Sequence, residues 1–558
     1  MQTFHHILKS LYEKRPDEVA IYLQQAGQED LPISTQQLLR RAVGAQRKLE
    51  EAGILPGEVV LLILQHGEDL IYTYFGTILH GAIPSIMPYL TEKLQPDRYR
   101  ADLAALIEVT QPAAIFTFAE FASEVTSALI EGDSVRSVIL TNEIAWDGDL
   151  VIDLDRRQPG DIVLLQHSSG TTGLQKGVAL SHQAILNHIA TYADVLHFDD
   201  QDVIISWLPL YHDMGLIAGF LMPILYGRPL VLMSPFDWVR APYRLMHAIS
   251  HYQGTLVWLP NFAYNFCAQK IRPRHMEGVD LSSWRAVINC SEPMRHESHQ
   301  AFLEAFNPYG FRESAIATSY AMAENTFAVT QGGIDSPVTI DPVDRESLQV
   351  ERIARPATDN QPKIIMVSAG KSIPSTEVKI VDPEGHTLAD RYIGEIALRS
   401  NSMLTEYYHR PETTRQSFLD GWFLTGDYGY MLNGEVYITG RKKDLIIVGG
   451  KNIYPQDLER IAMTVRGVHP GRVVAFGVFS QRAGTEQVII VAEVDTEDQT
   501  EKQHIADDIR QVVTQGSAVA LRFVHIVEEG WIIKTSSGKT ARLANRDKFL
   551  QETGFTMD

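Results

Sequence analysis

A segment rich in glycine and hydroxyl side chains has the composition of a phosphate-binding loop. It reads SSGTTGLQKG at 168–177 and follows the apolar run IVLLQH at 162–167. Small residues after a strand let backbone N–H groups converge on phosphate oxygens, while serine, threonine and lysine add donors and charge. The alternative interpretation is an ordinary surface turn. The candidate triphosphate ligands are Ser168, Ser169, Gly170, Thr171, Thr172, Gly173 and Lys176.

This loop and four later segments resemble the acyl-adenylate-forming superfamily, which includes acyl-CoA synthetases, peptide-synthetase adenylation domains and luciferases. The later segments are NCSEP at 289–293, TSYAMAE at 318–324, WFLTGDYG at 422–429 and KTSSGKTAR at 534–542. Gly177 follows Lys176, so the loop lacks the hydroxyl that coordinates magnesium in the common P-loop, and the metal must be held elsewhere. The resemblance implies an enzyme that activates a carboxylic acid with ATP and Mg²⁺.

The resemblance also implies individual roles. Tyr320 would stack on adenine, Asp427 would bind both ribose hydroxyls, and Glu324 would ligate magnesium together with Thr171. Lys539 would bridge the attacking carboxylate and the α-phosphate, a contribution of about 3 kcal/mol or more. Beyond the loop, the implied nucleotide site comprises Ser291, Glu292, Thr318, Ser319, Tyr320, Ala321, Asp427 and Arg441.

Other segments resemble fatty acyl-AMP ligases in particular, among them SWLPLYHDMGLIAG at 206–219 and LPNFAYNFCAQKI at 259–271. The resemblance places His212 at the mouth of an acyl tunnel as a catalytic residue, although a buried histidine at a helix start is the alternative. Trp207, Met214 and Gly215 would line the acyl pocket. The substrate is then a fatty acid or a related carboxylic acid.

The interval between Glu324 and Lys379 is longer than in CoA ligases of the same fold, as in fatty acyl-AMP ligases. Long insertions in compact domains are usually functional or disordered, and that family is taken to use this one against the CoA-using arrangement. The implied acceptor is the phosphopantetheine thiol of an acyl carrier protein on a separate chain. Two alternatives remain open: an acyl-CoA synthetase that uses free CoA, and a catalytically silent nucleotide-binding or scaffold protein.

Carrier proteins are generally acidic, so their docking onto an acidic enzyme calls for a local basic patch. The C-terminal part of the chain offers Arg441, Lys442, Lys443, Lys451, Lys534, Arg542, Arg546 and Lys548 as candidates.

Apolar runs that alternate with helical stretches predict an α/β protein, with strands at VVLLIL (59–64), AAIFTF (113–118) and GTLVWL (254–259) and a helix at QAILNHIATYADVL (183–196). The resemblance implies an adenylate-forming enzyme fold. We expect an N-terminal adenylation domain of stacked α/β subdomains at 1–440, with a β-rich subdomain at about 375–440, and a small mobile α+β domain at 441–558. Lys443 would be the hinge for its rotation between the two half-reactions.

The composition excludes several classes of protein. Among the 558 residues, 69 are acidic and 49 are basic, for a net charge of −20, which argues against a nucleic-acid surface. The two cysteines, Cys267 and Cys290, are too few for a disulfide framework. The apolar stretch at 214–233 is broken by Pro223 and Pro229, so we expect no membrane span. These features and the N-terminal sequence predict a cytoplasmic enzyme.

Overall fold

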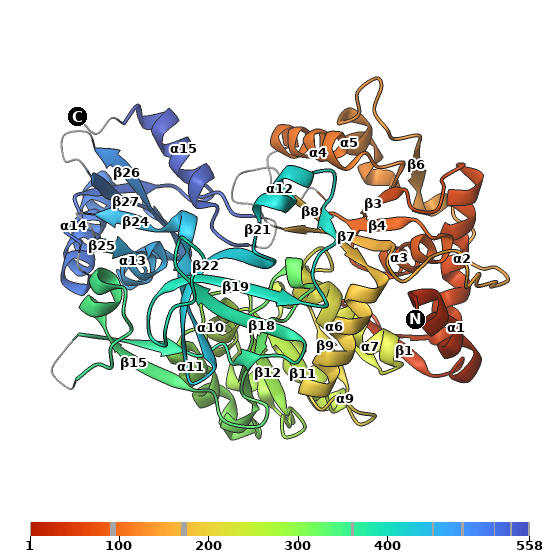
Figure 1. The fold of residues 1–558 in the computed structure, drawn as a ribbon, viewed down its shortest axis with the longest axis horizontal. Coiled ribbons are helices and arrows are strands. Elements are labelled where there is room, and N and C mark those ends of the chain that lie inside the picture. The colour runs from red at the N-terminus through yellow and green to blue at the C-terminus, as the bar shows by residue number, and fades with distance from the viewer. Residues whose placement is uncertain are drawn as a thin grey trace.

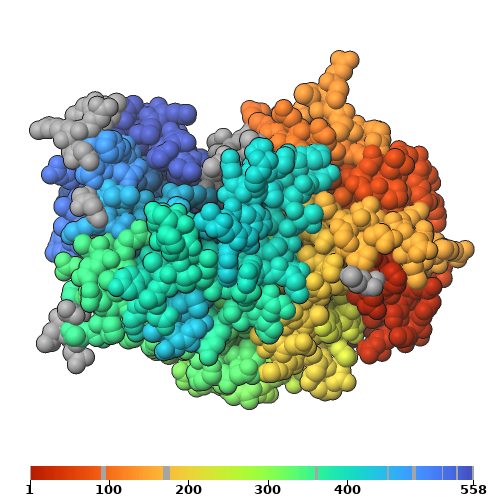
Figure 2. Space-filling view, in the orientation of Figure 1, coloured from red at the N-terminus to blue at the C-terminus, as the bar shows by residue number. Residues whose placement is uncertain are grey.

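The computed structural model describes residues 2–89, 96–168, 176–358, 362–448, 451–480, 485–517, 519–535 and 538–555. The chain proceeds along the long axis of the molecule, from the red and orange N-terminal part at one end to the blue C-terminal part at the other (Figure 1). The space-filling view shows a notch between these two parts, bounded below by the cyan β-rich part (Figure 2). The arrangement confirms the expected α/β architecture.

A seven-stranded sheet forms the centre of the N-terminal part, in the order β13-β12-β11-β9-β10-β1-β2. All neighbouring pairs are parallel except β1 and β2. Its strands are almost wholly apolar because helices cover both faces of such a sheet. They are β1 (Val19–Gln24), β2 (Leu31–Ser34), β9 (Ile204–Ser206), β10 (Leu230–Met233), β11 (Leu256–Leu259), β12 (Ala286–Asn289) and β13 (Ile316–Thr318).

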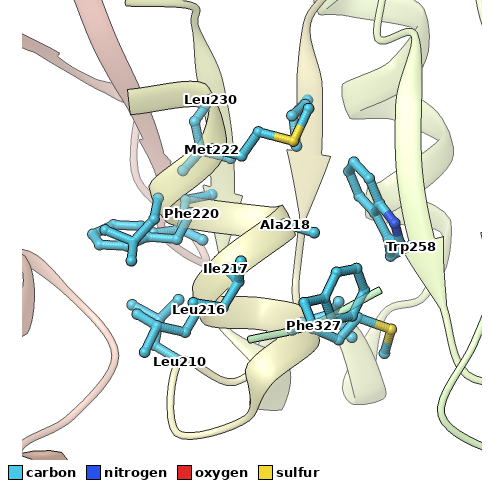
Figure 3. Close-up of a cluster of buried hydrophobic side chains, with 14 of the residues drawn as sticks. Leu210, Leu216, Ile217, Ala218, Phe220, Met222, Leu230, Trp258 and Phe327 are labelled. Atoms are coloured by element: carbon cyan, nitrogen blue, oxygen red, sulfur yellow. The ribbon is translucent and has the colours of Figure 1, made fainter. Parts of the chain in front are cut away.

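The helical segments around this sheet include a π-helix, η3 (Met214–Leu221), whose residues are all buried. Leu216, Ile217 and Phe220 of η3 lie in the same apolar cluster as Trp258 of β11 and Phe327 (Figure 3). The other helices here are α1 (Phe4–Lys14), α6 (His182–Val195), α7 (Met222–Tyr226), α8 (Pro235–Arg240), α9 (Tyr243–Tyr252), α10 (Asn261–Lys270) and α11 (His296–Phe306). Among the described residues, no helix has the length and apolarity to cross a bilayer.

A second, four-stranded parallel sheet has the order β4-β3-β5-β6. The apolar runs at 59–64 and 113–118 form two of its strands, as the sequence predicts. Its elements are β3 (Val59–Ile63), β4 (Ile83–Ile86), β5 (Ala114–Thr117) and β6 (Ser137–Leu140), with helices α2 (Thr35–Glu51), α3 (Glu68–His80), α4 (Pro96–Thr110) and α5 (Ala122–Ser127).

Antiparallel strands make up the region between these sheets and the C-terminal domain. One sheet has the order β20-β8-β7 and a larger one the order β14-β17-β23-β22-β19-β18, with β21 paired to β22. The larger sheet also includes β14 and β17, which lie before residue 375, where the β-rich subdomain was expected to begin. The elements are β7 (Ile162–Ser168), β8 (Lys176–Ser181), β14 (Thr330–Gln331), β17 (Lys371–Ser372), β18 (Thr376–Val381), β19 (Gly394–Ser400), β20 (Glu406–Tyr407), α12 (Pro411–Gln416), β21 (Phe418–Leu419), β22 (Trp422–Leu432) and β23 (Glu435–Arg441).

The expected insertion contains a two-stranded hairpin, β15 (Ile340–Asp344) and β16 (Lys363–Val367), with a π-helix, η8 (Ser347–Glu351), after β15. Two hydrogen bonds join it to the C-terminal domain: Arg345 Nη1 donates to the Gly516 carbonyl at 2.8 Å, and Asn452 Nδ2 donates to the Gln349 carbonyl at 3.3 Å.

The C-terminal domain has its own apolar cores, one of which contains Ala475, Ile490 and Ile509. Separate cores support the expected division into domains at 1–440 and 441–558, although the exact boundary stays a prediction. The elements are β24 (Ile446–Val448), β25 (Lys451–Ile453), α13 (Pro455–Ala462), β26 (Val468–Ser480), β27 (Thr485–Val494), α14 (Gln499–Gly516), β28 (Phe523–Val527) and α15 (Arg542–Thr553). Short 3-10 turns lie at η1 (Ala119–Phe121), η2 (Thr141–Glu143), η4 (Pro273–Met276), η5 (Asn307–Tyr309), η6 (Glu313–Ala315), η7 (Ala323–Asn325) and η9 (Lys442–Asp444).

Candidate active site

The carboxyl ends of parallel strands gather the candidate residues on one edge of the central sheet. Trp207 to Gly215 follow β9, Cys290 to Glu292 follow β12, and Ser319 to Glu324 follow β13. Parallel strands all end at the same edge, which is where open α/β sheets bind their ligands. The topology therefore brings together segments that are more than a hundred residues apart in the chain.

Tyr320, Asp427 and Arg441 form one cluster at this edge. Tyr320 Oη donates to Asp427 Oδ2 at 2.6 Å, and Arg441 Nε lies 3.5 Å from Asp427 Oδ1. Asp427 and Arg441 face each other because they are register partners on β22 and β23. Burial, followed by the Asp427 charge, raises the pKa of Tyr320, so its phenol stays a neutral donor. A carboxylate held in this way offers acceptors that fit a pair of vicinal hydroxyls.

The backbone that carries Tyr320 is fixed by buried hydrogen bonds to the neighbouring segment at 328–332. The Thr318 N–H donates to the Gly332 carbonyl at 3.1 Å, Ser319 Oγ donates to the Thr330 carbonyl at 2.8 Å, and the Tyr320 N–H donates to Thr330 Oγ1 at 3.1 Å. Ala321 continues this pairing as a bridge partner of Ala328. The result is a rigid platform beneath the expected adenine site.

Glu324 and Lys176 both contact Tyr407. Tyr407 Oη donates to Glu324 Oε1 at 2.8 Å, and Lys176 Nζ lies 4.6 Å from the centroid of the Tyr407 ring. The pairing of β20 with β8 creates this arrangement, because Tyr407 lies opposite Val178, two residues from Lys176. Burial raises the pKa of Glu324. A half-buried carboxylate that accepts a hydrogen bond from a neutral phenol keeps its negative charge available for a hard divalent cation such as Mg²⁺.

Lys539 comes from the C-terminal domain and lies half-buried, within electrostatic reach of the charged groups of the N-terminal site. Burial lowers its pKa and the Arg441 charge lowers it further, whereas the Asp213 and Glu292 carboxylates act in the opposite direction. The structure thus brings the last motif of the sequence to the edge where the earlier motifs meet.

His212 pairs with a residue that the sequence analysis did not single out. His212 Nδ1 lies 2.6 Å from Asp213 Oδ1, and the Met214 N–H donates to the same oxygen at 2.8 Å. Burial by itself would raise the pKa of Asp213, but the His212 charge and hydrogen bond, with the Lys539 charge, outweigh it and lower that pKa. Asp213 therefore stays ionised beside Lys539. In the sequence, only its position next to His212 could have marked Asp213 as a residue of the site.

Glu292 and Ser291 line the same edge from the segment after β12. The Phe262 N–H donates to Glu292 Oε2 at 2.9 Å, and burial raises the pKa of Glu292, against the effect of this hydrogen bond and of Lys539. Ser291 has a left-handed backbone with φ of 69°. Its Oγ lies 3.8 Å from the sulfur of Met214, which connects this segment to the expected acyl pocket.

The expected acyl pocket lies among stacked aromatic rings. Trp207 stacks on Trp238 with ring centroids 3.6 Å apart, and Phe262 makes a T-shaped contact with each of these rings. Gly215 packs so closely on the preceding segment that a Cβ would lie 2.3 Å from the Pro209 carbonyl oxygen. Trp238 and Phe262 were not singled out from the sequence, because an aromatic residue in a helix is usually part of the core.

Several expected residues are not placed by these contacts. Ser169, Gly170, Thr171, Thr172, Gly173 and the side chain of Ser168 lie outside the described residues. Their binding of phosphate, and the ligation of magnesium by Thr171, stay predictions. Lys443 lies in η9, where burial and the Arg441 charge lower its pKa, and its hinge role also stays a prediction.

The expected basic docking patch is largely engaged within the protein. Arg441 lies beside Asp427, Lys442 Nζ donates to Glu395 Oε2 at 2.8 Å, and Lys548 Nζ donates to the Trp531 carbonyl at 2.9 Å. Arg542 is buried between two carboxylates. This part of the docking hypothesis is therefore weakened, since paired cations are less available to a partner.

The AMP-binding enzyme family matches residues 9–408. The medium-chain-fatty-acid–[acyl-carrier-protein] ligase JamA of Moorena producens is 31% identical over 95% of this chain and 92% of that protein. The long-chain-fatty-acid–AMP ligase FadD32 of Mycobacterium marinum is 32% identical over 91% and 87%. A structure from a study of fatty acyl-adenylate ligases of E. coli and L. pneumophila superposes with a TM-score of 0.91, 26% identity and 99% coverage of both chains.

Proposed function

Because the chain belongs to the AMP-binding enzyme family, we propose that it activates a fatty acid with ATP to give acyl-AMP and pyrophosphate, and then transfers the acyl group to the phosphopantetheine thiol of an acyl carrier protein. One observation carries the proposal. Lys539, from the C-terminal domain, is half-buried and interacts electrostatically with Asp213 after β9, Glu292 after β12 and Arg441 at the end of β23.

In the first half-reaction the fatty acid carboxylate attacks the α-phosphorus and pyrophosphate leaves. Lys539 would lie between the two anionic groups, and its ammonium would neutralise charge that shifts from carboxylate to phosphate. Asp427 and Arg441 would orient the ribose, and Tyr320 would hold the adenine. Mg²⁺, held by Glu324, would supply a Lewis acid for the phosphate oxygens. Positioning and charge neutralisation account for the rate, since little covalent chemistry falls to the protein.

In the second half-reaction the carrier thiol attacks the acyl carbonyl and AMP leaves. Two observations favour a carrier protein over free CoA as the acceptor. The insertion hairpin is present and contacts the C-terminal domain through Arg345 and Gln349, and a relative with 31% identity is named as an acyl-carrier-protein ligase. We place the reaction in the cytoplasm, since both cysteines are free and buried.

A product assay tests this proposal. The protein is incubated with ATP, Mg²⁺ and a panel of fatty acids, with or without CoA and holo carrier protein, and the products are identified by mass. We expect acyl-AMP to accumulate until carrier protein is added. Rapid formation of acyl-CoA with free CoA would show the alternative acyl-CoA synthetase.

The Lys539→Ala variant tests the role of this lysine, and Lys9→Ala, at a half-buried lysine of α1 away from the site, serves as the matched control. We expect Lys539→Ala to lose about 100-fold or more of its pyrophosphate release, the effect of removing one well-placed donor. An unchanged rate in Lys539→Ala would overturn the role given to this residue.

A further inference from the structure

The turn that carries Lys539 is closed by its own backbone. Lys534 and Thr540 are bridge partners, the Thr535 N–H donates to the Lys539 carbonyl at 2.7 Å, and the Lys539 N–H donates to Thr535 Oγ1 at 3.1 Å. These bonds fix the shape of the turn. They do not fix its place relative to the rest of the site, because every partner belongs to the turn itself.

Asn545, fully buried in α15, closes the base of this turn. Its Oδ1 accepts from the Ile533 N–H at 2.8 Å, and its Nδ2 donates to the carbonyls of Ile533 and Ala541, each at 2.8 Å. One side chain thereby holds both ends of the turn on the first residues of α15. The position of Lys539 then depends on how α15 is held, together with the bond that the Ile532 N–H donates to Glu493 Oε1 of β27 at 2.6 Å.

Arg542, the first residue of α15, joins this assembly to two other segments. Its Nε and Nη2 donate to the two carboxylate oxygens of Glu459 at 2.9 and 2.7 Å, and its Nη1 donates to Asp444 Oδ2 at 2.8 Å. The side chains of Arg542, Asp444 and Glu459 are only 19%, 6% and 9% exposed. Glu459 is itself anchored, since its Oε1 accepts from the Ala475 N–H at 3.1 Å.

The triad of Arg542, Asp444 and Glu459 connects two segments that each carry a candidate site residue. Arg542 lies three residues after Lys539, and Asp444 lies three residues after Arg441. Lys539, which is half-buried, and Arg441, whose side chain is 44% exposed, carry like charges and repel each other. A bond between Arg542 and Asp444 holds the two segments together in spite of this repulsion.

A buried ion pair is weak evidence for stability, because desolvation offsets most of its attraction, and fixing a register is its best-attested use. We propose that Arg542 is a positioning residue that, through Asp444 and Glu459, fixes the Lys539 turn relative to the segment at 441–444, so that Lys539 and Arg441 enter the same site. This inference rests on the proposed role of Lys539 in adenylation.

Asp444→Asn and Arg542→Met test the inference, with Arg546→Met as the matched control one turn further along α15, where the arginine pairs only with its neighbour Asp547 among the described residues. Asp444→Asn leaves both bonds between Arg542 and Glu459 in place and removes only the charge that ties the turn to the segment at 441–444. We measure kcat and KM of pyrophosphate release, acyl transfer from supplied acyl-AMP, and Tm.

We expect kcat for adenylation to fall about 10- to 100-fold in both variants, as for a misplacement of about 1 Å. KM for ATP, Tm of Asp444→Asn and transfer from supplied acyl-AMP should stay near those of the parent, as should kcat and KM for adenylation and Tm of Arg546→Met, because adenylation requires no carrier protein. A purely structural triad would lower Tm and both half-reactions together, and this would overturn the inference.

Asp444→Asn decides the question if Arg542→Met does not fold. Wild-type adenylation in a folded Asp444→Asn variant would also overturn the inference. The parallel result with Lys539→Ala separates the two levels: if Lys539→Ala loses adenylation while Asp444→Asn keeps it, the positioning role fails and the proposed function stands.

Discussion

At the scale of single residues, Glu324 gives the sharpest test of the metal site. Glu324→Gln can still accept the hydrogen bond from Tyr407 Oη, but it carries no charge for Mg²⁺. We expect pyrophosphate release to fall on the order of 100-fold and the Mg²⁺ concentration for half-maximal activity to rise. A Mg²⁺ titration of Glu324→Gln against the exposed control Glu13→Gln measures both effects. An unchanged titration curve would place the metal elsewhere.

The protonation of Lys539 sets a second prediction at this scale. Its pKa lies below the ordinary value of 10.5, first because of burial and then because of Arg441, while Glu292 counteracts them. The ammonium form is the active one, so adenylation should be lost on the alkaline side before pH 10.5 is reached. Glu292→Gln removes a counteracting charge and should move this limb to lower pH. The pH dependence of kcat checks both statements, with circular dichroism as the control for folding. If the alkaline limb of Glu292→Gln moves to higher pH instead, the statement about Glu292 is wrong.

The sequence predicted motif residues better than their partners. Tyr320, Glu324, Asp427, Arg441 and Lys539 were identified because their motifs resemble those of the acyl-adenylate-forming superfamily, and the structure brings them to one edge. Contacts such as those of Tyr407 with Glu324 and of Arg542 with Asp444 join segments 83 and 98 positions apart. No local pattern reports such a distance, because it depends on how the strands pair.

At the scale of elements, Gly215 shows why the segment after β9 has its particular form. A Cβ there would lie 2.3 Å from the Pro209 carbonyl oxygen and 3.0 Å from Leu208 Cβ. We expect Gly215→Ala to lower the stability of the N-terminal domain by about 1–3 kcal/mol, the usual cost of overpacking, and to lower Tm. Gly160→Ala is the matched control, since nothing lies within 4 Å of its added Cβ. Equal Tm values for the two variants would contradict this packing argument.

Long apolar runs were predictable as strands, whereas short or irregular elements were not. The runs at 59–64, 113–118 and 254–259 contain β3, β5 and β11, because four or more consecutive buried residues leave a clear pattern. The two-residue strands β14 and β17 have no periodicity of their own and exist through pairing with neighbours. The π-helix η3 has the same apolar composition as an α-helix, so composition could not distinguish the two.

At the scale of the whole molecule, one ion pair joins the two domains and offers a test of the expected rotation of the C-terminal domain. Arg295 Nη2, at the start of α11, donates to Asp457 Oδ1 of α13 at 2.9 Å, and both side chains are about one-fifth exposed (21% and 19%). In this structure the pair forms while Lys539 lies at the site, and the expected rotation of the C-terminal domain would break it. It should therefore stabilise the adenylation arrangement relative to any rotated one, by about 1 kcal/mol for a pair of this exposure.

Exchanging the charges of Arg295 and Asp457 tests whether their pair stabilises the adenylation arrangement, because the double variant still has one arginine and one aspartate at these positions. Arg295→Asp and Asp457→Arg each place like charges opposite one another, so each should slow adenylation several-fold, and the double variant should recover most of the loss. Because a direct interaction appears as non-additivity, pyrophosphate release in all four proteins gives the coupling energy. Additive losses would mean that the two residues act independently, and the domains would then be held together by other contacts, such as the bond from Arg345 to the Gly516 carbonyl.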